Sequence, residues 1–259
     1  MNLGVPRESP ALHSAETVSC HSPSGACATG TSGSAVLVHA LASPAVQRIT
    51  ILSRRPVALA ASQPKAKVII HKDYAQYPPE LLAQLGGATA CIWAQGISSR
   101  GMQEKEYSEI TVDYPLAAAK TFAGLGEKMN FVHVSGEGAN MSGTGPFMFG
   151  RVKGRAETAL LEEQKSSQSL RVYNVRPATI APQGKYTADR DLSMQDRVEA
   201  PVAWALDKVW KNAVIPADKL AAVLVDLALS DGEPLPAGGG IEAEGRLVRN
   251  SAVRRLAGM

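Results

Sequence analysis

The feature of this sequence that most restricts its fold is an alternation of short apolar segments with longer helical segments, between about residue 34 and residue 229. The apolar segments are rich in β-branched residues and lack polar alternation, which is typical of strands covered on both faces of a sheet. The segments between them are long enough for crossover helices. We therefore predict an α/β fold with a doubly wound, mostly parallel sheet of the Rossmann-like type. The expected strands are 48–52, 67–70, 88–94, 130–134 and 170–175, and the expected helices are 34–41, 80–85, 104–125 with a kink at Pro115, 149–164 and 216–229.

Composition excludes several classes of protein. The chain has 259 residues, 45% of them hydrophobic, which is typical of a folded globular protein. A net charge of +3 from 27 basic and 24 acidic residues gives no field that would favour nucleic acid. No apolar run approaches the roughly 18 to 20 residues of a membrane span, and the first 25 residues lack a signal peptide's apolar core. With only three cysteines, we expect a cytoplasmic protein. The five histidines show no metal-ligand spacing, so we expect no metal.

A glycine-rich turn precedes the first expected helix. A turn of this kind at a helix start offers free N–H groups and a positive dipole end to a phosphate. The strand that follows ends at Ser53, about 20 residues after Gly33, where a dinucleotide fold places its ribose-reading residue. Arg54 and Arg55 follow and no acid is present, which favours the 2′-phosphate of NADP over the 2′-hydroxyl of NAD; a solvated basic turn is the alternative. The candidate phosphate-binding residues are Thr29, Gly30, Thr31, Ser32 and Gly33.

The strand that should precede this turn is not evident. Residues 17–20 are short for a central strand, and Pro23 cannot donate a ladder hydrogen bond. Cys27 also stands where the fingerprint has glycine. We therefore expect the first strand to be degraded or replaced, either by residues 24–28 that pair poorly or because the N-terminal residues are not the ancestral ones. Accordingly we treat residues 1–25 as an atypical, poorly ordered segment and 26–259 as a single dinucleotide-binding domain, with a small C-terminal portion on the substrate side at about 183–259. The polar stretch 183–198 reads as an insertion there.

From about residue 28 to residue 182 the chain resembles atypical short-chain dehydrogenases/reductases of the Tat-interacting-protein-like NAD(P)-binding subgroup, as found in fungal proteins described as nucleoside-diphosphate-sugar epimerases. Five segments carry this resemblance in order and spacing. They are Ala-Thr-Gly-Thr-Ser-Gly at 28–33, Ser-Arg-Arg-Pro at 53–56, Val-Ser-Gly at 134–136, Phe-Gly-Arg-Val-Lys-Gly-Arg-Ala-Glu at 149–157, and Val-Arg-Pro at 175–177.

The resemblance implies a role for each matching residue. Ser135 matches the serine that hydrogen-bonds the substrate carbonyl, and Lys153 matches the lysine that holds the nicotinamide ribose and lowers the pKa of a neighbouring tyrosine. That tyrosine belongs one helical turn earlier, where this chain has Phe149. Asp73 matches an acid that meets the adenine, and Ala94 begins a segment, 94–96, that would line the cofactor. Replacement donors in the loops would be Ser142, Thr144, Glu137 or Tyr186, or a water held by the serine and lysine; the spacing selects none of them.

These residues leave three functions open. The first is an NADP-dependent oxidoreductase that acts on a carbonyl or hydroxyl of a small organic molecule, with secondary metabolism as the expected context. The second is an NADP(H)-binding sensor or scaffold without redox turnover, which Phe149 favours because a phenyl ring has no proton to give. The third is an isomerase or dehydratase that reuses the same pocket. A homodimer through the helix 104–125 is a further expectation, and the sequence does not specify a substrate.

Overall fold

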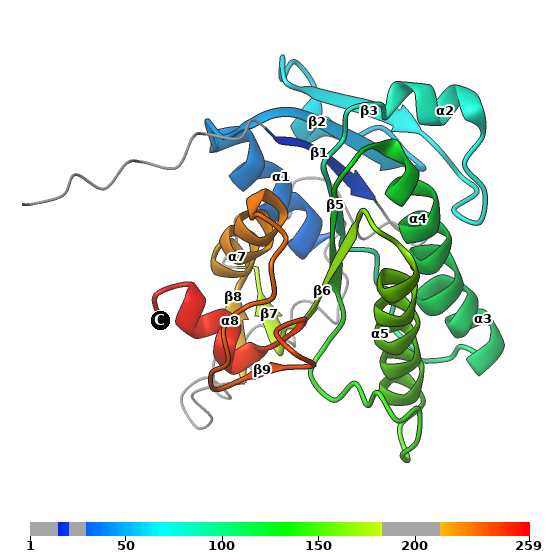
Figure 1. The fold of residues 1–259 in the computed structure, drawn as a ribbon, viewed down its shortest axis with the longest axis vertical. Coiled ribbons are helices and arrows are strands. Elements are labelled where there is room, and N and C mark those ends of the chain that lie inside the picture. Colours follow the sequence, from blue (N-terminus) through cyan, green and yellow to red (C-terminus); the bar gives the residue numbers. More distant parts are fainter. Residues whose placement is uncertain (1–14, 21–29, 183–212) are drawn as a thin grey trace, which may run out of the picture.

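The structure, a computed structural model, describes residues 15–20, 30–182 and 213–259 (Figure 1). Eight strands form one sheet in the order β3-β2-β1-β4-β5-β6-β10-β9, and all neighbouring pairs are parallel except β10 and β9. The first six positions follow the order of a doubly wound dinucleotide fold, which confirms the predicted fold class. The strands are β1 (Ala15–Cys20), β2 (Val46–Ser53), β3 (Ala66–Ile70), β4 (Ala90–Trp93), β5 (Met129–Val134), β6 (Leu170–Arg176), β9 (Ile241–Glu242) and β10 (Leu247–Arg249).

The central position of the sheet is filled by β1, so a first strand is present, within the segment 1–25 that we expected to be poorly ordered. β1 pairs with β2 and with β4 in parallel register. A strand between two others satisfies its neighbours' backbone groups whatever its side chains are, whereas the sequence Ala-Glu-Thr-Val-Ser-Cys lacks the apolar run by which such strands are recognised. Residues 1–14 and 21–29, including Cys27 and Thr29, lie outside the described residues.

Helices cover both faces of the sheet (Figure 1). On one face, α1 (Thr31–Ala42) packs against α7 (Ala217–Leu229), with α8 (Asn250–Leu256) beyond it. On the other face lie α2 (Pro79–Gln84), α4 (Tyr114–Phe122) and α5 (Met148–Ser166). Each face has its own apolar core, so the strands between them are buried on both sides, as their unbroken apolar composition predicted.

The expected long helix 104–125 consists of several helical segments. It comprises α3 (Glu104–Ser108), a π-helical turn (Glu109–Asp113), α4 and a final 3-10 turn (Ala123–Leu125). In the π-helical turn the N–H of Tyr114 donates to the carbonyl of Glu109, five residues back. The irregularity directly precedes Pro115, which lacks an N–H and crowds the preceding turn. The sequence thus predicted the place of the break but not its form.

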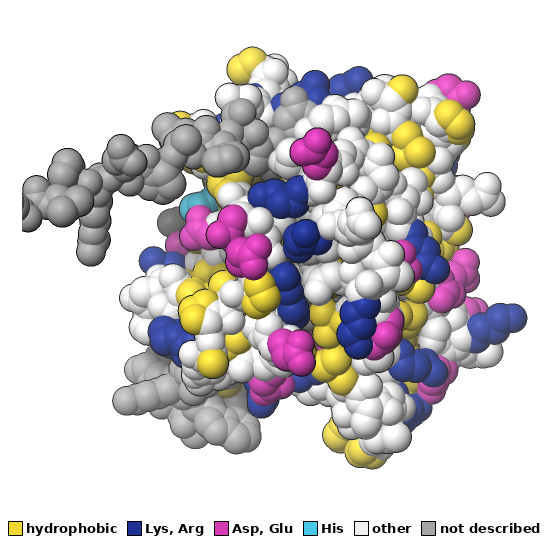
Figure 2. Space-filling model, in the orientation of Figure 1, with side chains coloured by type: hydrophobic (Ala, Val, Ile, Leu, Met, Phe, Trp, Pro, Cys, Tyr) yellow, Lys and Arg dark blue, Asp and Glu magenta, His cyan; other side chains and the backbone are white. Residues whose placement is uncertain are grey.

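The C-terminal residues add elements that the sequence did not predict. β10 extends the main sheet beside β6, β9 pairs with β10, and β7 (Thr179–Ala181) pairs with β8 (Val214–Pro216) in a separate two-stranded sheet. The predicted insertion 183–198 lies outside the described residues. Within the described ranges, no helix is long and apolar enough to cross a membrane, and no three His, Cys, Asp or Glu side chains gather as a metal site requires. Figure 2 shows both signs of charge interspersed on one face of the molecule.

Candidate functional site

A cleft of about 1130 Å³ lies at the carboxyl ends of the central strands. The turns after β4, β5 and β6 meet there with the start of α1 and with the segment after β10. Because the chain passes from β1 to β2 on one side and returns to β4 on the other, this is the switch point at which open α/β sheets bind ligands. The lining residues are Gly30, Thr31, Ser32, Ala94, Gln95, Gly96, Val134, Ser135, Gly136, Glu137, Phe149, Lys153, Pro177, Ala178, Thr179, Ile180, Ala213, Arg249, Asn250 and Ser251.

The amino end of α1 opens onto this cleft. Gly30 is the N-cap residue, with extended φ and ψ of −90° and 161°, and as a glycine it has no side chain with which to cap the helix. The first turn contains no acidic residue. The first N–H groups of a helix have no acceptor within the helix, and the dipole adds positive potential there. Gly30, Thr31 and Ser32 line the cleft as predicted, Gly33 is buried within the helix, and Thr29 lies outside the described residues.

Lys153 and Ser135 meet on the opposite wall. The Lys153 ammonium donates to the backbone carbonyl of Ser135, with 2.7 Å between Nζ and O. Burial lowers the pKa of Lys153 to about 8, against the opposing charge of Glu157, which raises it. The hydroxyl of Ser135 is buried and has no hydrogen-bond partner in the part of the chain that the structure describes. The structure therefore brings the predicted serine and lysine together, with one donor group left to serve a bound molecule.

Behind Lys153 lies a neutral histidine. His133 and Asn174 form a hydrogen bond of 2.8 Å between Nδ1 and Oδ1. Because the Asn174 amide nitrogen donates to the carbonyl of Glu157, its oxygen is the acceptor and His133 Nδ1 carries the proton. Burial lowers the pKa of His133 to about 4, the charge of Lys153 adds to this effect, and the bond to Asn174 opposes it. The histidine therefore adds no charge beneath the lysine at neutral pH.

Two glycines on α5 let the loop after β5 lie directly on the helix. A Cβ on Gly154 would stand 1.7 Å from the carbonyl oxygen of Asn140, and a Cβ on Gly150 would stand 2.5 Å from that of Gly138. Asn140 N–H in turn donates to the carbonyl of Gly150. Backbone contact of this kind tolerates no side chain. The helix that carries Lys153 is thereby held against the loop that begins with Ser135.

Phe149 occupies the position of the missing phenol and lines the cleft. Its ring lies against Gly138, where a Cβ would be 3.2 Å from ring carbons, and tilts against Phe147 at 6.1 Å between centroids. Phe149 and Lys153 are one helical turn apart on α5 and both face the cleft. A hydroxyl at the tip of this ring is therefore the group that the site lacks.

The replacement donors suggested by the sequence are placed differently. Ser142 and Thr144 hydrogen-bond each other at 2.6 Å between hydroxyl oxygens, on an exposed loop that is not part of the cleft lining. Glu137 lines the cleft, but its carboxylate accepts from Arg249 and from the N–H of Asn250. Tyr186 lies outside the described residues. Among the described residues, none of these groups takes the place of a tyrosine.

Gln95 is a lining residue that the sequence included only as part of a segment. Its side chain is 5% exposed, and its amide nitrogen and oxygen are both buried without a partner. No sequence pattern distinguishes it from an exposed glutamine, because its burial depends on the turn after β4. Like Ser135, it has buried polar atoms with no partner among the described residues, and such atoms call for an explanation.

The residues predicted to bind the adenosine part of the dinucleotide are not part of the cleft lining. Ser53 accepts from the N–H of Arg55 at 3.3 Å, and Arg55 is exposed. Partial burial lowers the pKa of Arg54, and the nearby hydroxyl of Tyr74 opposes this. Asp73 is exposed, and one of its oxygens accepts from the N–H of Ala75 at 3.0 Å. These residues lie at the carboxyl ends of β2 and β3, which is the same edge of the sheet as the cleft.

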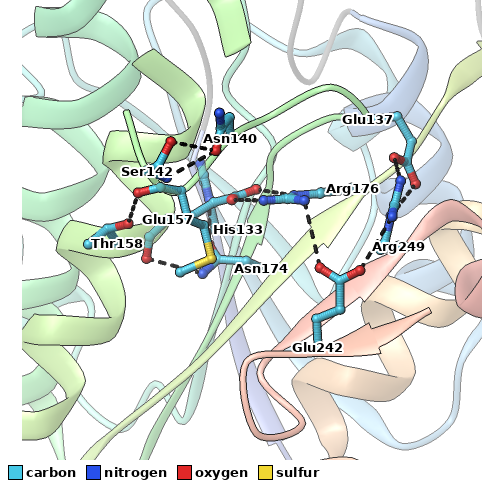
Figure 3. A network of polar contacts seen from close by, with 11 residues as sticks. His133, Glu137, Asn140, Ser142, Glu157, Thr158, Asn174, Arg176, Glu242 and Arg249 are labelled. Atoms are coloured by element: carbon cyan, nitrogen blue, oxygen red, sulfur yellow. Dashed lines mark hydrogen bonds and ion pairs between the residues drawn. The ribbon is translucent and has the colours of Figure 1, made fainter. Parts of the chain in front are cut away.

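A chain of charged side chains runs from α5 to the C-terminal strands (Figure 3). Arg176 pairs with Glu157 through two hydrogen bonds of 2.8 and 2.6 Å and lies 4.0 Å from Glu242. Arg249 joins Glu242 at 3.4 Å and Glu137 at 2.9 Å. Sequence reasoning did not identify this network. The one available signal was an arginine closing an apolar strand in Val-Arg-Pro, opposite an acid on the preceding helix.

Two curated proteins are similar in sequence. Leucinostatins biosynthesis cluster protein T from Purpureocillium lilacinum is 33% identical over 254 residues, which cover 84% of this chain and 88% of that protein. Botcinic acid biosynthesis cluster B protein 16 from Botryotinia fuckeliana is 33% identical over 138 residues, covering 50% of this chain and 87% of that protein. No family model matches the chain.

Solved structures are similar in fold. A short-chain type dehydrogenase/reductase from Mycobacterium ulcerans has a TM-score of 0.61 at 16% identity, covering 93% of this chain and 90% of that one. The enzyme WbmF from Bordetella bronchiseptica, solved with NAD+ and UDP, has a TM-score of 0.58 at 12% identity, covering 97% of this chain and 80% of that one. At these identities the similarity concerns the fold.

Proposed function

The chain belongs to the same protein family as leucinostatins biosynthesis cluster protein T and has the fold of the short-chain dehydrogenases/reductases, and on this premise we propose that it is an NADP-dependent oxidoreductase. It would act on a carbonyl or hydroxyl group of a small organic molecule in secondary metabolism, a context supported by two relatives that are named as biosynthesis cluster proteins. Membership of the Tat-interacting-protein-like subgroup, and pairing of two subunits through α3 and α4, remain predictions.

The observation that carries this proposal is Ser135, whose backbone carbonyl accepts from Lys153 and whose hydroxyl has no partner among the described residues, in a cleft that also receives the amino end of α1. A dinucleotide fits these groups: its pyrophosphate would lie on the N–H groups of Gly30 to Ser32, and its nicotinamide ribose would lie near Lys153. NADPH, when bound, would supply the hydride, and a water held by Ser135 and Lys153 would supply the proton that the carbonyl oxygen takes up. Ser135 would donate to the substrate carbonyl oxygen, and Lys153 would add positive charge beside it.

We expect the two arginines after β2 to determine the choice of dinucleotide. The double variant Arg54→Ala with Arg55→Ala should lower the preference for NADPH over NADH by about 10- to 100-fold, because charge-assisted hydrogen bonds to the 2′-phosphate are lost. Fluorescence titration with both dinucleotides measures this. Arg48→Ala is the matched control, since Arg48 lies near the start of β2, at the opposite edge of the sheet. An unchanged ratio in the double variant would contradict the assignment to NADP.

The lowered pKa of Lys153 predicts how stability depends on pH. The folded protein releases this proton near pH 8, whereas the unfolded chain holds it to about pH 10.5. The unfolded state therefore binds more protons between these values, and the free energy of unfolding should rise with pH there, by at most about 1.4 kcal/mol per pH unit.

Urea unfolding of wild type and Lys153→Met at pH 7 to 10 should show this slope in wild type and its loss in the variant. Lys219→Met, which changes an exposed lysine on α7, should keep the slope; a slope unchanged by Lys153→Met would contradict the burial of a charge at this site.

The second candidate is an NADP(H)-binding sensor or scaffold without redox turnover, and Phe149 is the observation that favours it. With the phenol absent, NADPH would bind in the same cleft but would not be oxidised. Following NADPH absorbance with a panel of quinones, ketones and aldehydes distinguishes the two functions. Tight binding with no oxidation across the panel supports the sensor, whereas turnover supports the enzyme.

A further inference from the structure

Gln95 is buried in a way that the described residues do not explain. The side-chain amide has two donor hydrogens and an acceptor oxygen, yet neither polar atom has a partner among the described residues, and the residue is only 5% exposed. Burying such a group without partners is costly, and native structures seldom retain one without a reason. Because Gln95 lines the cleft, a molecule bound there can supply the partner.

Gln95 lies next to Ser135, and this position limits which chemical groups a bound molecule can place against it. Trp93 of β4 and His133 of β5 are partners in register, and each of the two residues lies two positions beyond that pair. Gln95 and Ser135 therefore leave adjacent strands side by side at the same edge of the sheet. Both residues are more than nine-tenths buried and line one cleft, and the polar atoms at the ends of their side chains have no partner among the described residues.

We propose that Gln95 recognises an amide group of a bound molecule, with its Nε2 donating to the amide oxygen and its Oε1 accepting from the amide N–H. A group with one donor and one adjacent acceptor, as in an amide, satisfies both atoms at once. A carboxylate would place a negative oxygen against Oε1, and an ester or ketone would leave Oε1 unpaired in a buried site. The inference rests on the proposed function in one respect, that Ser135 holds the reacting carbonyl oxygen next to this amide.

An amide in this cleft has two sources. One is a substrate in which an amide neighbours the reacting carbonyl, that is, a keto amide. The other is the carboxamide on the nicotinamide ring of the dinucleotide. Both present the same pair of hydrogen-bonding groups, so the experiment has one arm for each.

The substrate arm compares N-methylacetoacetamide with methyl acetoacetate, which differ in an N–H replaced by an oxygen. Calorimetric titration of wild-type protein, with and without NADP+, should show the amide binding about 10- to 100-fold more tightly. Gln95→Leu should reduce this preference to within about twofold. The dinucleotide arm compares NADP+ with its 3-acetylpyridine analogue, which lacks the amide N–H groups, in the same two proteins. In one of the two arms, wild type should prefer the ligand that carries the amide and Gln95→Leu should not. That arm identifies the source of the amide.

The control is Gln168→Leu, which changes an exposed glutamine just before β6, at the opposite edge of the sheet from the cleft; it should keep every preference of wild type. Gln95→Leu removes an unpaired buried amide, so its melting temperature without ligand should be no lower than that of wild type. If it does fold poorly, Gln95→Met, with an unbranched side chain of similar length, replaces it in both arms.

The proposal is overturned if wild type discriminates in neither arm, or if Gln95→Leu keeps the discrimination. Failure of the proposed function is a separate result. A wild-type protein that binds no dinucleotide contradicts the proposed function, yet the amide and ester comparison without dinucleotide still decides the role of Gln95.

Discussion

Phe149→Tyr is expected to raise the kcat/KM of carbonyl reduction by about 10²- to 10⁴-fold, the usual contribution of a positioned general acid. The ring already lines the cleft, one helical turn before Lys153. Adding a hydroxyl changes little volume, and Lys153, with its pKa lowered to about 8, would help to lower the pKa of the new phenol. The rate of NADPH oxidation with ketones, aldehydes and quinones measures the gain.

Two further variants separate this gain from a general effect of a tyrosine. Phe147→Tyr is the matched control, because Phe147 contacts the ring of Phe149 but is 67% exposed and is not part of the cleft lining; it should leave the rate unchanged. Lys153→Met introduced together with Phe149→Tyr should abolish most of the gain. If Phe149→Tyr folds and binds NADPH without any increase in rate, the absent phenol is not what limits turnover, and the sensor function becomes the better explanation.

Most of the sheet could be predicted because its strands carry their own signal. β4, β5 and β6 are buried on both faces, and their apolar runs match this burial. β1 could not be recognised in the same way, because its place is fixed by hydrogen bonds to β2 and β4 rather than by an apolar run. β9 and β10 were not predicted, because strands of two and three residues are too short to show a hydrophobic pattern.

In the candidate site, too, some residues could be predicted from the sequence and others could not. Ser135 and Lys153 could be predicted because each stands at a fixed spacing within a motif, and the structure joins them at 2.7 Å between the lysine nitrogen and the serine carbonyl. Gln95 has no such spacing, and its importance appears only when its burial is known. The contact between Glu157 and Arg176 joins residues 19 positions apart, on α5 and on β6, and such a contact depends on how the helix lies on the sheet.

That buried ion pair leads to the second large effect, in this case on stability. Glu157→Leu should lower the free energy of unfolding by about 3 to 5 kcal/mol, because it leaves the charge of Arg176 buried without its close partner. The side chain of Glu157 is 0% exposed and that of Arg176 is 8% exposed. Glu242 is 46% exposed and lies 4.0 Å from Arg176, which is too distant to replace the two lost hydrogen bonds. Urea unfolding at pH 7 measures the loss.

A double-mutant cycle tests whether this loss belongs to the pair rather than to the size of the side chain. Glu157→Leu combined with Arg176→Met removes both charges, and because apolar residues can replace a buried ion pair at little or no cost, the double variant should recover most of the stability lost in Glu157→Leu. Lys120→Met, which removes a half-exposed lysine 3.7 Å from Glu163, is the control for an exposed pair and should cost at most about 1 kcal/mol. If the losses of the two single variants at Glu157 and Arg176 simply add, the pair is not coupled.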